Sequence, residues 1–273
     1  MASTTQVDQI KEKHRAIWDA GDYGDVARRL VAEVGEVAVQ RAGIGPGMEV
    51  LDVACGTGNA TIPAAEAGAA RVVGLDLAPT LVEEARERAA AAGVDVELIV
   101  GDCEALPFEN ASFDRVVSAI GVQFAPRHEA SAAELLRVSR PGGIIVLANW
   151  TPEGFIGRFF KVLSGYMPPL PDFASPPPLW GSEDHVRELL GDGAEIRTER
   201  REVVFEHASP AEFIDYFAEV YGPLLAARGA TEAEGRWDDL RAELISLCEE
   251  SNRDPAGFAA PSEYLVVTAR RAA

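Results

Sequence analysis

The stretch Val50-Leu51-Asp52-Val53-Ala54-Cys55-Gly56-Thr57-Gly58-Asn59 decides the fold of this chain. The apolar run from Met48 to Ala54 predicts a buried strand, and the small residues after it predict a tight turn into a helix over 60–67. Glycines permit such a turn and lack the Cβ that would hold a ligand away, while the helix N-terminus supplies free N–H groups. This order of elements predicts a site for a nucleotide-like ligand.

Four further strands are predicted, each separated from the next by a helical or turn-rich stretch, over 71–76, 94–100, 113–119 and 143–150. The second strand ends in Asp76, which lies 24 positions after Asp52 (76 − 52). That is near the spacing at which a second-strand acid accepts hydrogen bonds from ribose hydroxyls. The alternation predicts an α/β fold with a mostly parallel sheet and a site at the carboxyl ends of its strands.

The order of the motifs is specific. After the glycine loop and Asp76 come Gly-Asp-Cys-Glu-Ala-Leu-Pro-Phe at 101–108, Ser-Phe-Asp-Arg-Val-Val-Ser-Ala at 112–119 and Leu-Leu-Arg-Val-Ser-Arg-Pro-Gly-Gly at 135–143. Over about residues 44–150 this order resembles the class I S-adenosylmethionine (SAM)-dependent methyltransferases, in particular the small-molecule branch of quinone and natural-product enzymes with a type 11 methyltransferase domain. The resemblance implies a Rossmann-like three-layer sandwich whose seven-stranded sheet has the order 3-2-1-4-5-7-6, with strand 7 antiparallel. One departure is Ala54, where the family has the first glycine of its loop.

The resemblance also implies how SAM is held. Asp52 is expected to hold the ammonium group directly or through water, Asp76 both ribose hydroxyls, and Asp102 the adenine amine. Each of these acids also has a purely structural interpretation, as a turn or helix-capping residue. The full set of expected cofactor contacts is Asp52, Ala54, Gly56, Gly58, Asn59, Asp76, Leu77, Asp102, Cys103, Ala119, Tyr23 and Trp18.

Two other function classes stay open. A nicotinamide-dependent oxidoreductase would need Gly-x-Gly-x-x-Gly or Ala, and from Gly56 the third position of that pattern is Thr61. A SAM-binding protein that no longer transfers methyl, as a regulator or a repurposed scaffold, would keep the same cofactor motifs. The glycine pattern disfavours the first class, and only an acceptor screen addresses the second.

The flanks of the core are expected to choose the substrate. The predicted division is an N-terminal helical cap (1–43), a SAM-binding core (44–150), a lid insertion (151–190) and the remainder of the α/β domain (191–273). Helices over 7–18 and 25–42 are expected to bring Trp18 and Tyr23 over the methionine end, unless Trp18 packs on the flank of the sheet. The proline-rich, aromatic segment 151–190 predicts a lid over an apolar pocket, the alternative being a packed crossover.

The remaining elements follow from start signals and apolar patterns. Strands are predicted over 196–205 and 262–269. Capping boxes at Thr80-x-x-Glu83, Ser209-x-x-Glu212 and Thr231-x-x-Glu234 predict three helix starts.

Because the sulfonium methyl is already activated, alignment and exclusion of water are expected to dominate catalysis. No general base is assigned: His128 and His185 are weak candidates, each with a structural alternative as a helix-start residue, and Gln123 faces the acceptor in this topology but cannot act as a base. His14 and His207 are expected at the surface. Expected substrate contacts are Gln123, Phe124, Trp150, Phe155, Phe159, Trp180 and Tyr216.

Composition agrees with this interpretation. The 273 residues carry a formal net charge of −19, which argues against nucleic-acid and anionic-membrane partners and leaves a small-molecule acceptor. Cys55, Cys103 and Cys248 lack zinc-site spacing, no metal is expected, and the N-terminus lacks an apolar signal core. We therefore expect a cytoplasmic monomer or homodimer.

Overall fold

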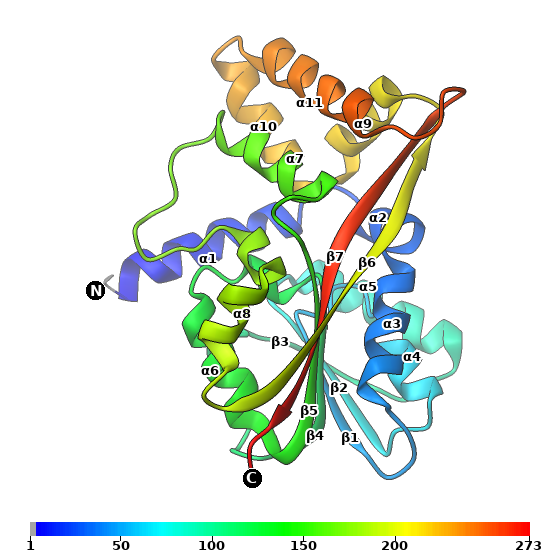
Figure 1. The fold of residues 1–273 in the computed structure, drawn as a ribbon, viewed down its shortest axis with the longest axis vertical. Helices are drawn as coiled ribbons and strands as arrows, with labels where there is room; N and C mark the ends of the chain where they lie inside the picture. Colours follow the sequence, from blue (N-terminus) through cyan, green and yellow to red (C-terminus); the bar gives the residue numbers. More distant parts are fainter. Residues whose placement is uncertain (1–3) are drawn as a thin grey trace.

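The computed structural model describes residues 4–273, and a single seven-stranded sheet forms its centre (Figure 1). Its strands are β1 (Glu49–Val53), β2 (Arg71–Asp76), β3 (Glu97–Val100), β4 (Phe113–Ala119), β5 (Ser139–Trp150), β6 (Ala194–His207) and β7 (Phe258–Arg271). The order is β3-β2-β1-β4-β5-β7-β6, with β1 to β5 parallel and β7 antiparallel to both of its neighbours. Both the order and the antiparallel last strand expected from the family resemblance are confirmed.

Helices cover both faces of the sheet, so its central strands are buried on each side. They are α1 (Thr4–Trp18), α2 (Tyr23–Leu30), α3 (Ala32–Ala42), α4 (Thr61–Glu66), α5 (Pro79–Ala92), α6 (His128–Val138), α7 (Phe155–Ser164), α8 (Glu183–Leu190), α9 (Pro210–Val220), α10 (Gly222–Ala233) and α11 (Trp237–Ser251), with 3₁₀ turns at Val122–Phe124 and Pro177–Gly181. Side chains alternate along a strand, so Val146 packs in the cluster with α3, whereas Ile145 packs in the cluster with α6 and α8.

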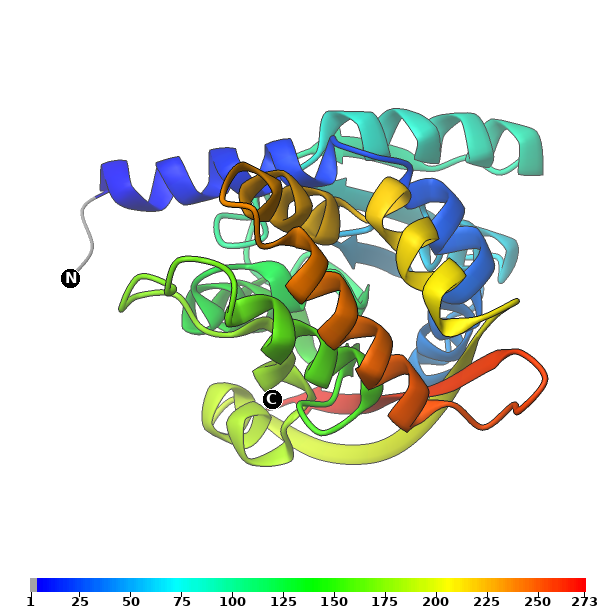
Figure 2. The ribbon, with the colours of Figure 1, turned by 90° about the horizontal axis from the view of Figure 1, so that it is seen from above.

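A long β6–β7 ribbon carries a group of helices, α7 and α9 to α11, which we call the helical cap and which is separate from the N-terminal helices α1 to α3. Trp150 at the end of β5 pairs with Tyr264, while β6 and β7 continue to the pair His207 and Phe258. The connection between the two strands forms α9, α10 and α11, and α7 packs against α11. These helices therefore gather at the end toward which the parallel strands point (Figures 1 and 2).

Three predicted helix boundaries were wrong, each for a local reason. The helix expected over 25–42 is divided at Val31, whose φ of −130° is not helical. Thr80 lies inside α5, which begins at Pro79, and its hydroxyl donates to Asp19 instead of capping. Thr231 lies buried inside α10 and donates to the Ala227 carbonyl. The box at Ser209 is confirmed, since its hydroxyl accepts from the Glu212 N–H at 3.2 Å.

The segment expected to form one lid is divided between two faces of the sheet. Its α7 joins the helical cap and packs with β7 and α11. Its second half, the Pro177–Gly181 turn and α8, packs on β5 and α6 instead, and Trp180 there is fully buried. The Trp180 side chain packs in the core cluster that also contains residues of α6 and α8, so this half of the segment forms a packed crossover.

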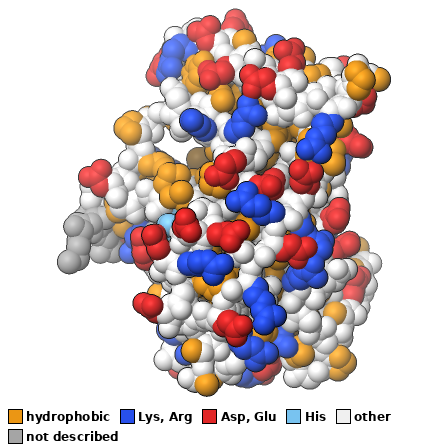
Figure 3. Space-filling view, viewed as in Figure 1, with side chains coloured by type: hydrophobic (Ala, Val, Ile, Leu, Met, Phe, Trp, Pro, Cys, Tyr) orange, Lys and Arg blue, Asp and Glu red, His pale blue; other side chains and the backbone are white. Residues whose placement is uncertain are grey.

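The surface mixes charges of both signs. Acidic and basic side chains lie side by side on the face drawn in Figure 3. The edge strand β6 takes part in this pattern through ion pairs such as Arg41–Glu199 and Arg200–Glu263. Charges along an edge strand oppose pairing with a second sheet. Among residues 4–273, no helix combines the length and apolar character that a membrane crossing requires.

Candidate functional site

The candidate site lies where the carboxyl ends of β1 to β4 meet, and its loops are held in unusual conformations. Gly56 has a φ of 52°, and Ala54 and Ile120 also lie in the left-handed region at 54° and 67°. A β-branched residue there is rare and costs on the order of 1–3 kcal/mol. A Cβ added to Gly121 would lie 2.1 Å from the Ala54 carbonyl oxygen, so these two loops touch backbone to backbone.

The loops enclose a cleft with an empty volume of about 870 Å³, measured to its open mouth. Helix α1 closes one side of it through Lys11, His14 and Trp18. All of the expected cofactor residues except Asp52 and Gly58 line this cleft, namely Trp18, Tyr23, Ala54, Gly56, Asn59, Asp76, Leu77, Asp102, Cys103 and Ala119. The topology thus brings together residues that are up to 101 positions apart in the chain (119 − 18).

Asp76, at the end of β2, fixes the glycine loop. Its Oδ2 accepts from the Gly56 N–H at 2.8 Å, and its Oδ1 accepts from the Ala78 N–H at 2.9 Å. Burial raises the pKa of this carboxyl group, while these backbone donors oppose the rise. A carboxylate has about four acceptor positions, so two remain for a ligand in the cleft.

Asp52 lies behind the cleft and does not line it. Its Oδ2 accepts from the Thr61 hydroxyl at 2.6 Å, and its Oδ1 is buried with no partner among residues 4–273. Burial raises the pKa of Asp52 to about 7. An unpartnered buried acceptor is costly, so this oxygen is suited to a cation or a water molecule at the cleft wall.

Asp102, after β3, takes part in a charge cluster at the far end of the cleft. Lys11 Nζ lies 2.6 Å from Asp102 Oδ2 and 2.5 Å from Glu104 Oε2. Glu104 also accepts from the Arg127 backbone N–H at 2.6 Å and from Arg127 Nε at 2.7 Å. The Glu104 side chain is fully buried, so this carboxylate joins α1, the β3 loop and the start of α6.

Helix α1 is fastened over the cleft at further points. Arg15 Nε donates to the Leu77 carbonyl at 3.2 Å, and the Thr80 hydroxyl donates to Asp19 at 2.5 Å. The Trp18 ring packs edge-on against Tyr23 and Phe124, with centroid distances of 5.2 and 4.7 Å. The helix therefore forms a wall of the site.

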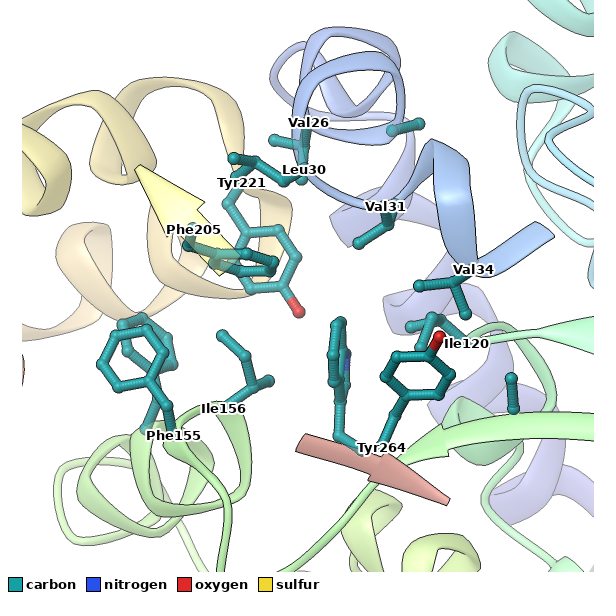
Figure 4. Packing of buried hydrophobic residues seen from close by; sticks show 14 of the residues in the cluster. Val26, Leu30, Val31, Val34, Ile120, Phe155, Ile156, Phe205, Tyr221 and Tyr264 are labelled. Carbon is teal, nitrogen blue, oxygen red and sulfur yellow. The ribbon is translucent and has the colours of Figure 1, made fainter. Parts of the chain in front are cut away.

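A second, smaller hollow adjoins the cleft and shares Trp18, Tyr23, Val31 and Phe124 with it. We call it the aromatic chamber; its empty volume is about 310 Å³. Its lining comprises Trp18, Tyr23, Val26, Val31, Ile120, Phe124, Trp150, Ile156, Phe205, Phe217 and Tyr221. Figure 4 labels part of this lining: Val26 of α2, Val31, Ile120, Ile156 of α7, Phe205 of β6 and Tyr221 at the α9–α10 junction.

The structure distributes the expected substrate residues unevenly. Phe124 and Trp150 line the aromatic chamber. Phe155 and Phe159 belong to the apolar core around it and do not line it. The Tyr216 hydroxyl donates to Asp25 at 2.9 Å, outside the chamber.

Trp180 and Gln123 lie away from both hollows and are fully buried. Among residues 4–273, neither the oxygen nor the nitrogen of the Gln123 amide has a partner. His128 packs beside Trp180, and its Nδ1 is 2.9 Å from His185 Nε2. Burial lowers the pKa of His128 to about 4. Neither histidine lines the cleft or the chamber.

Sequence reasoning missed Lys11, His14 and Glu104 as residues of the site. His14 was expected at the surface, but it lines the cleft, and burial lowers the pKa of its imidazole. The spacing of Lys11, His14 and Trp18 places all three on one face of α1, and that pattern was available in the sequence. The aromatic residues Tyr216, Phe217 and Tyr221 are predicted from the sequence either to line the pocket or to form a dimer contact, and the structure places Phe217 and Tyr221 in the chamber lining.

Comparisons with known proteins agree with this geometry. A family model described as a methyltransferase domain matches residues 50–143. An uncharacterized protein of Mycobacterium tuberculosis is 44% identical over 94% of this chain and 94% of its own. The demethylmenaquinone methyltransferase of Renibacterium salmoninarum is 38% identical over 59% of this chain and 63% of its own. The chain belongs to the class I methyltransferases.

The methyltransferase fold extends beyond the matched segment. The solved structure of the YcgJ protein from Bacillus subtilis has a TM-score of 0.63 at 14% identity, covering 88% of this chain and 99% of that one. At that identity the likeness concerns the fold alone. The glycine loop, Asp52, Asp76 and Asp102 of this methyltransferase lie within the segment that the family model matches. Helix α1 and the helical cap lie outside that segment.

Proposed function

We propose that the chain moves the sulfonium methyl of SAM onto a small, partly apolar acceptor and releases S-adenosylhomocysteine. One observation carries this proposal: the cleft that holds the carboxylates of Asp76 and Asp102 adjoins an uncharged, apolar chamber, and Trp18, Tyr23 and Phe124 line both. A two-part hollow of this kind suits a polar nucleoside donor beside an apolar acceptor.

The residues present fit SAM. Asp76 has free acceptor positions for the ribose hydroxyls, and Asp102 and the Cys103 backbone stand in the cleft for the adenine. Leu77 supplies an apolar surface for the ring. The unpartnered Asp52 Oδ1 lies behind the cleft wall and suits the ammonium group through a bridging water molecule. Ala54 replaces a glycine without closing the loop, since Gly121 leaves room opposite it.

When bound, SAM supplies an activated methyl, so that the C–S bond breaks with its electrons going to sulfur as the acceptor's lone pair bonds to carbon. The chain's own residues hold the two reactants in line and exclude water. Alignment of this kind can remove about 7–11 kcal/mol of barrier. Trp18 and α1 cover the cleft, while Phe124 stands between cleft and chamber. Among residues 4–273, no Asp, Glu, Lys, Arg or His lines the chamber, so the chamber itself offers no general base.

The proposal also covers the setting of the reaction. The net charge of −19 supports a small molecule over nucleic acid or an anionic membrane as partner. The three cysteines are free thiols, which supports action in a reducing cytoplasm. We propose that the enzyme works there as a monomer or homodimer.

Calorimetric titration with SAM and S-adenosylhomocysteine tests the cofactor assignment. Wild type should bind both in the micromolar range, and NADH should give no heat. Asp76→Asn should weaken binding at least tenfold, because it removes a charged acceptor of ribose hydroxyls. Asp95→Asn, in an exposed loop before β3, is the matched control and should bind as wild type does. Absence of binding by wild type to either ligand would contradict the proposal.

A further inference from the structure

The aromatic chamber carries no formal charge. Its polar side-chain groups are the two phenol hydroxyls of Tyr23 and Tyr221 and the two indole N–H groups of Trp18 and Trp150. An ionised ligand group placed there would lose its water without gaining a counter-ion, which is strongly unfavourable.

The Tyr221 hydroxyl is one of the polar groups that face the chamber. The residue is 6% exposed, and among residues 4–273 nothing hydrogen-bonds to its hydroxyl. Figure 4 shows the hydroxyl pointing into the middle of the aromatic and aliphatic side chains, away from the helix junction that carries it. A hydroxyl that faces a hollow and has no partner in the described part of the protein is free to donate to an oxygen atom of a ligand there.

We propose that the acceptor is a neutral, ring-bearing molecule with a hydroxyl or carbonyl oxygen that bonds the Tyr221 hydroxyl, and that the aromatic chamber excludes carboxylates and phosphates. This inference rests on the proposed function, because the chamber opens onto the cleft assigned to SAM. Tyr221 thereby acts as a positioning and specificity residue.

The chemistry of the two phenols agrees with donation. Burial raises the pKa of both Tyr23 and Tyr221, so each keeps its proton at neutral pH. Neither can take a proton from the acceptor under these conditions. The aromatic rings of Phe124, Trp150 and Phe217 offer faces and edges on which a planar ring can stack.

Three related probes test the proposal on protein saturated with S-adenosylhomocysteine: 2-naphthol, naphthalene and 2-naphthoate. Equilibrium dialysis gives their dissociation constants for wild type, Tyr221→Phe and Tyr216→Phe. In wild type, naphthol should bind about three- to tenfold tighter than naphthalene, and naphthoate at least 100-fold weaker than naphthol. Tyr221→Phe should abolish the advantage of naphthol, whereas Tyr216→Phe, whose hydroxyl bonds Asp25, should keep it.

Each of the other outcomes would overturn one part of the proposal. Naphthoate binding as tightly as naphthol would overturn the exclusion of charge. An advantage of naphthol that survives in Tyr221→Phe would overturn the role of its hydroxyl. Saturation by S-adenosylhomocysteine with none of the probes bound would overturn the chamber as acceptor site while leaving the proposed cofactor site intact. Failure of S-adenosylhomocysteine to bind wild type would overturn the proposed function and this inference together.

Discussion

Glu104 is the buried carboxylate on which the closed position of α1 depends, so we expect Glu104→Gln to destabilise the protein markedly. Its side chain is fully buried and faces Lys11, which is 13% exposed, and Arg127, which is 39% exposed. Removing one partner of a buried ion pair costs about 3–5 kcal/mol, whereas an exposed pair contributes about 0–1 kcal/mol. Arg127 is partly exposed, and glutamine keeps one acceptor oxygen at this position. We therefore expect the loss of unfolding free energy on Glu104→Gln to lie between those limits, at about 2–4 kcal/mol.

For a chain of this size each kcal/mol lowers Tm by about 2–4 °C, so Glu104→Gln should lower it by roughly 4–16 °C in calorimetric unfolding. Hydrogen exchange of α1 should also accelerate, since Lys11 loses its fully buried partner. The matched control is Glu83→Gln, because Glu83 pairs with Arg86 in an exposed i, i+3 arrangement. That change should shift stability by less than about 0.5 kcal/mol. A Tm within 1 °C of wild type for Glu104→Gln would refute the reasoning.

Four further predictions concern the cleft walls and the histidines. Burial raises the pKa of Asp52 to about 7 from 3.8, so the folded chain keeps a proton that the unfolded chain has lost, and stability falls as pH rises through that window. Asp52→Asn should therefore gain Tm relative to wild type between pH 5 and pH 8; a constant difference would contradict this. Ala54→Gly should change stability by under about 1 kcal/mol, because relief of a φ of 54° offsets the added freedom of glycine. Gly121→Ala, by contrast, should cost about 1–3 kcal/mol in urea unfolding, since its Cβ meets the Ala54 carbonyl. His128→Ala and His185→Ala should each leave turnover intact once folding is verified, and a loss above about 100-fold in either would show a catalytic role that the geometry does not support.

The core of the fold was predictable because its signals are local. The glycine loop, Asp76 and the segment 101–103 each follow an apolar strand, and parallel strands bring their carboxyl ends to one edge. The antiparallel β7 had no such signal and came from the family resemblance alone.

The errors arose where tertiary packing overrode a local pattern. Thr231 begins a capping-box sequence, yet it is buried within α10, where its hydroxyl bonds a backbone carbonyl. Trp180 follows a run of prolines, which indicated a lid, but its ring fills the core beneath α8. The sequence left Tyr221 open between the pocket and a dimer contact, because the chamber exists only after the helical cap folds over the end of β5.

A crystal structure of the protein with S-adenosylhomocysteine tests the central claim most directly. The account predicts the ribose hydroxyls on Asp76, the adenine beside Asp102 and Leu77, and the sulfur facing the aromatic chamber past Phe124. A ligand bound elsewhere, or with its ribose away from Asp76, would contradict the account.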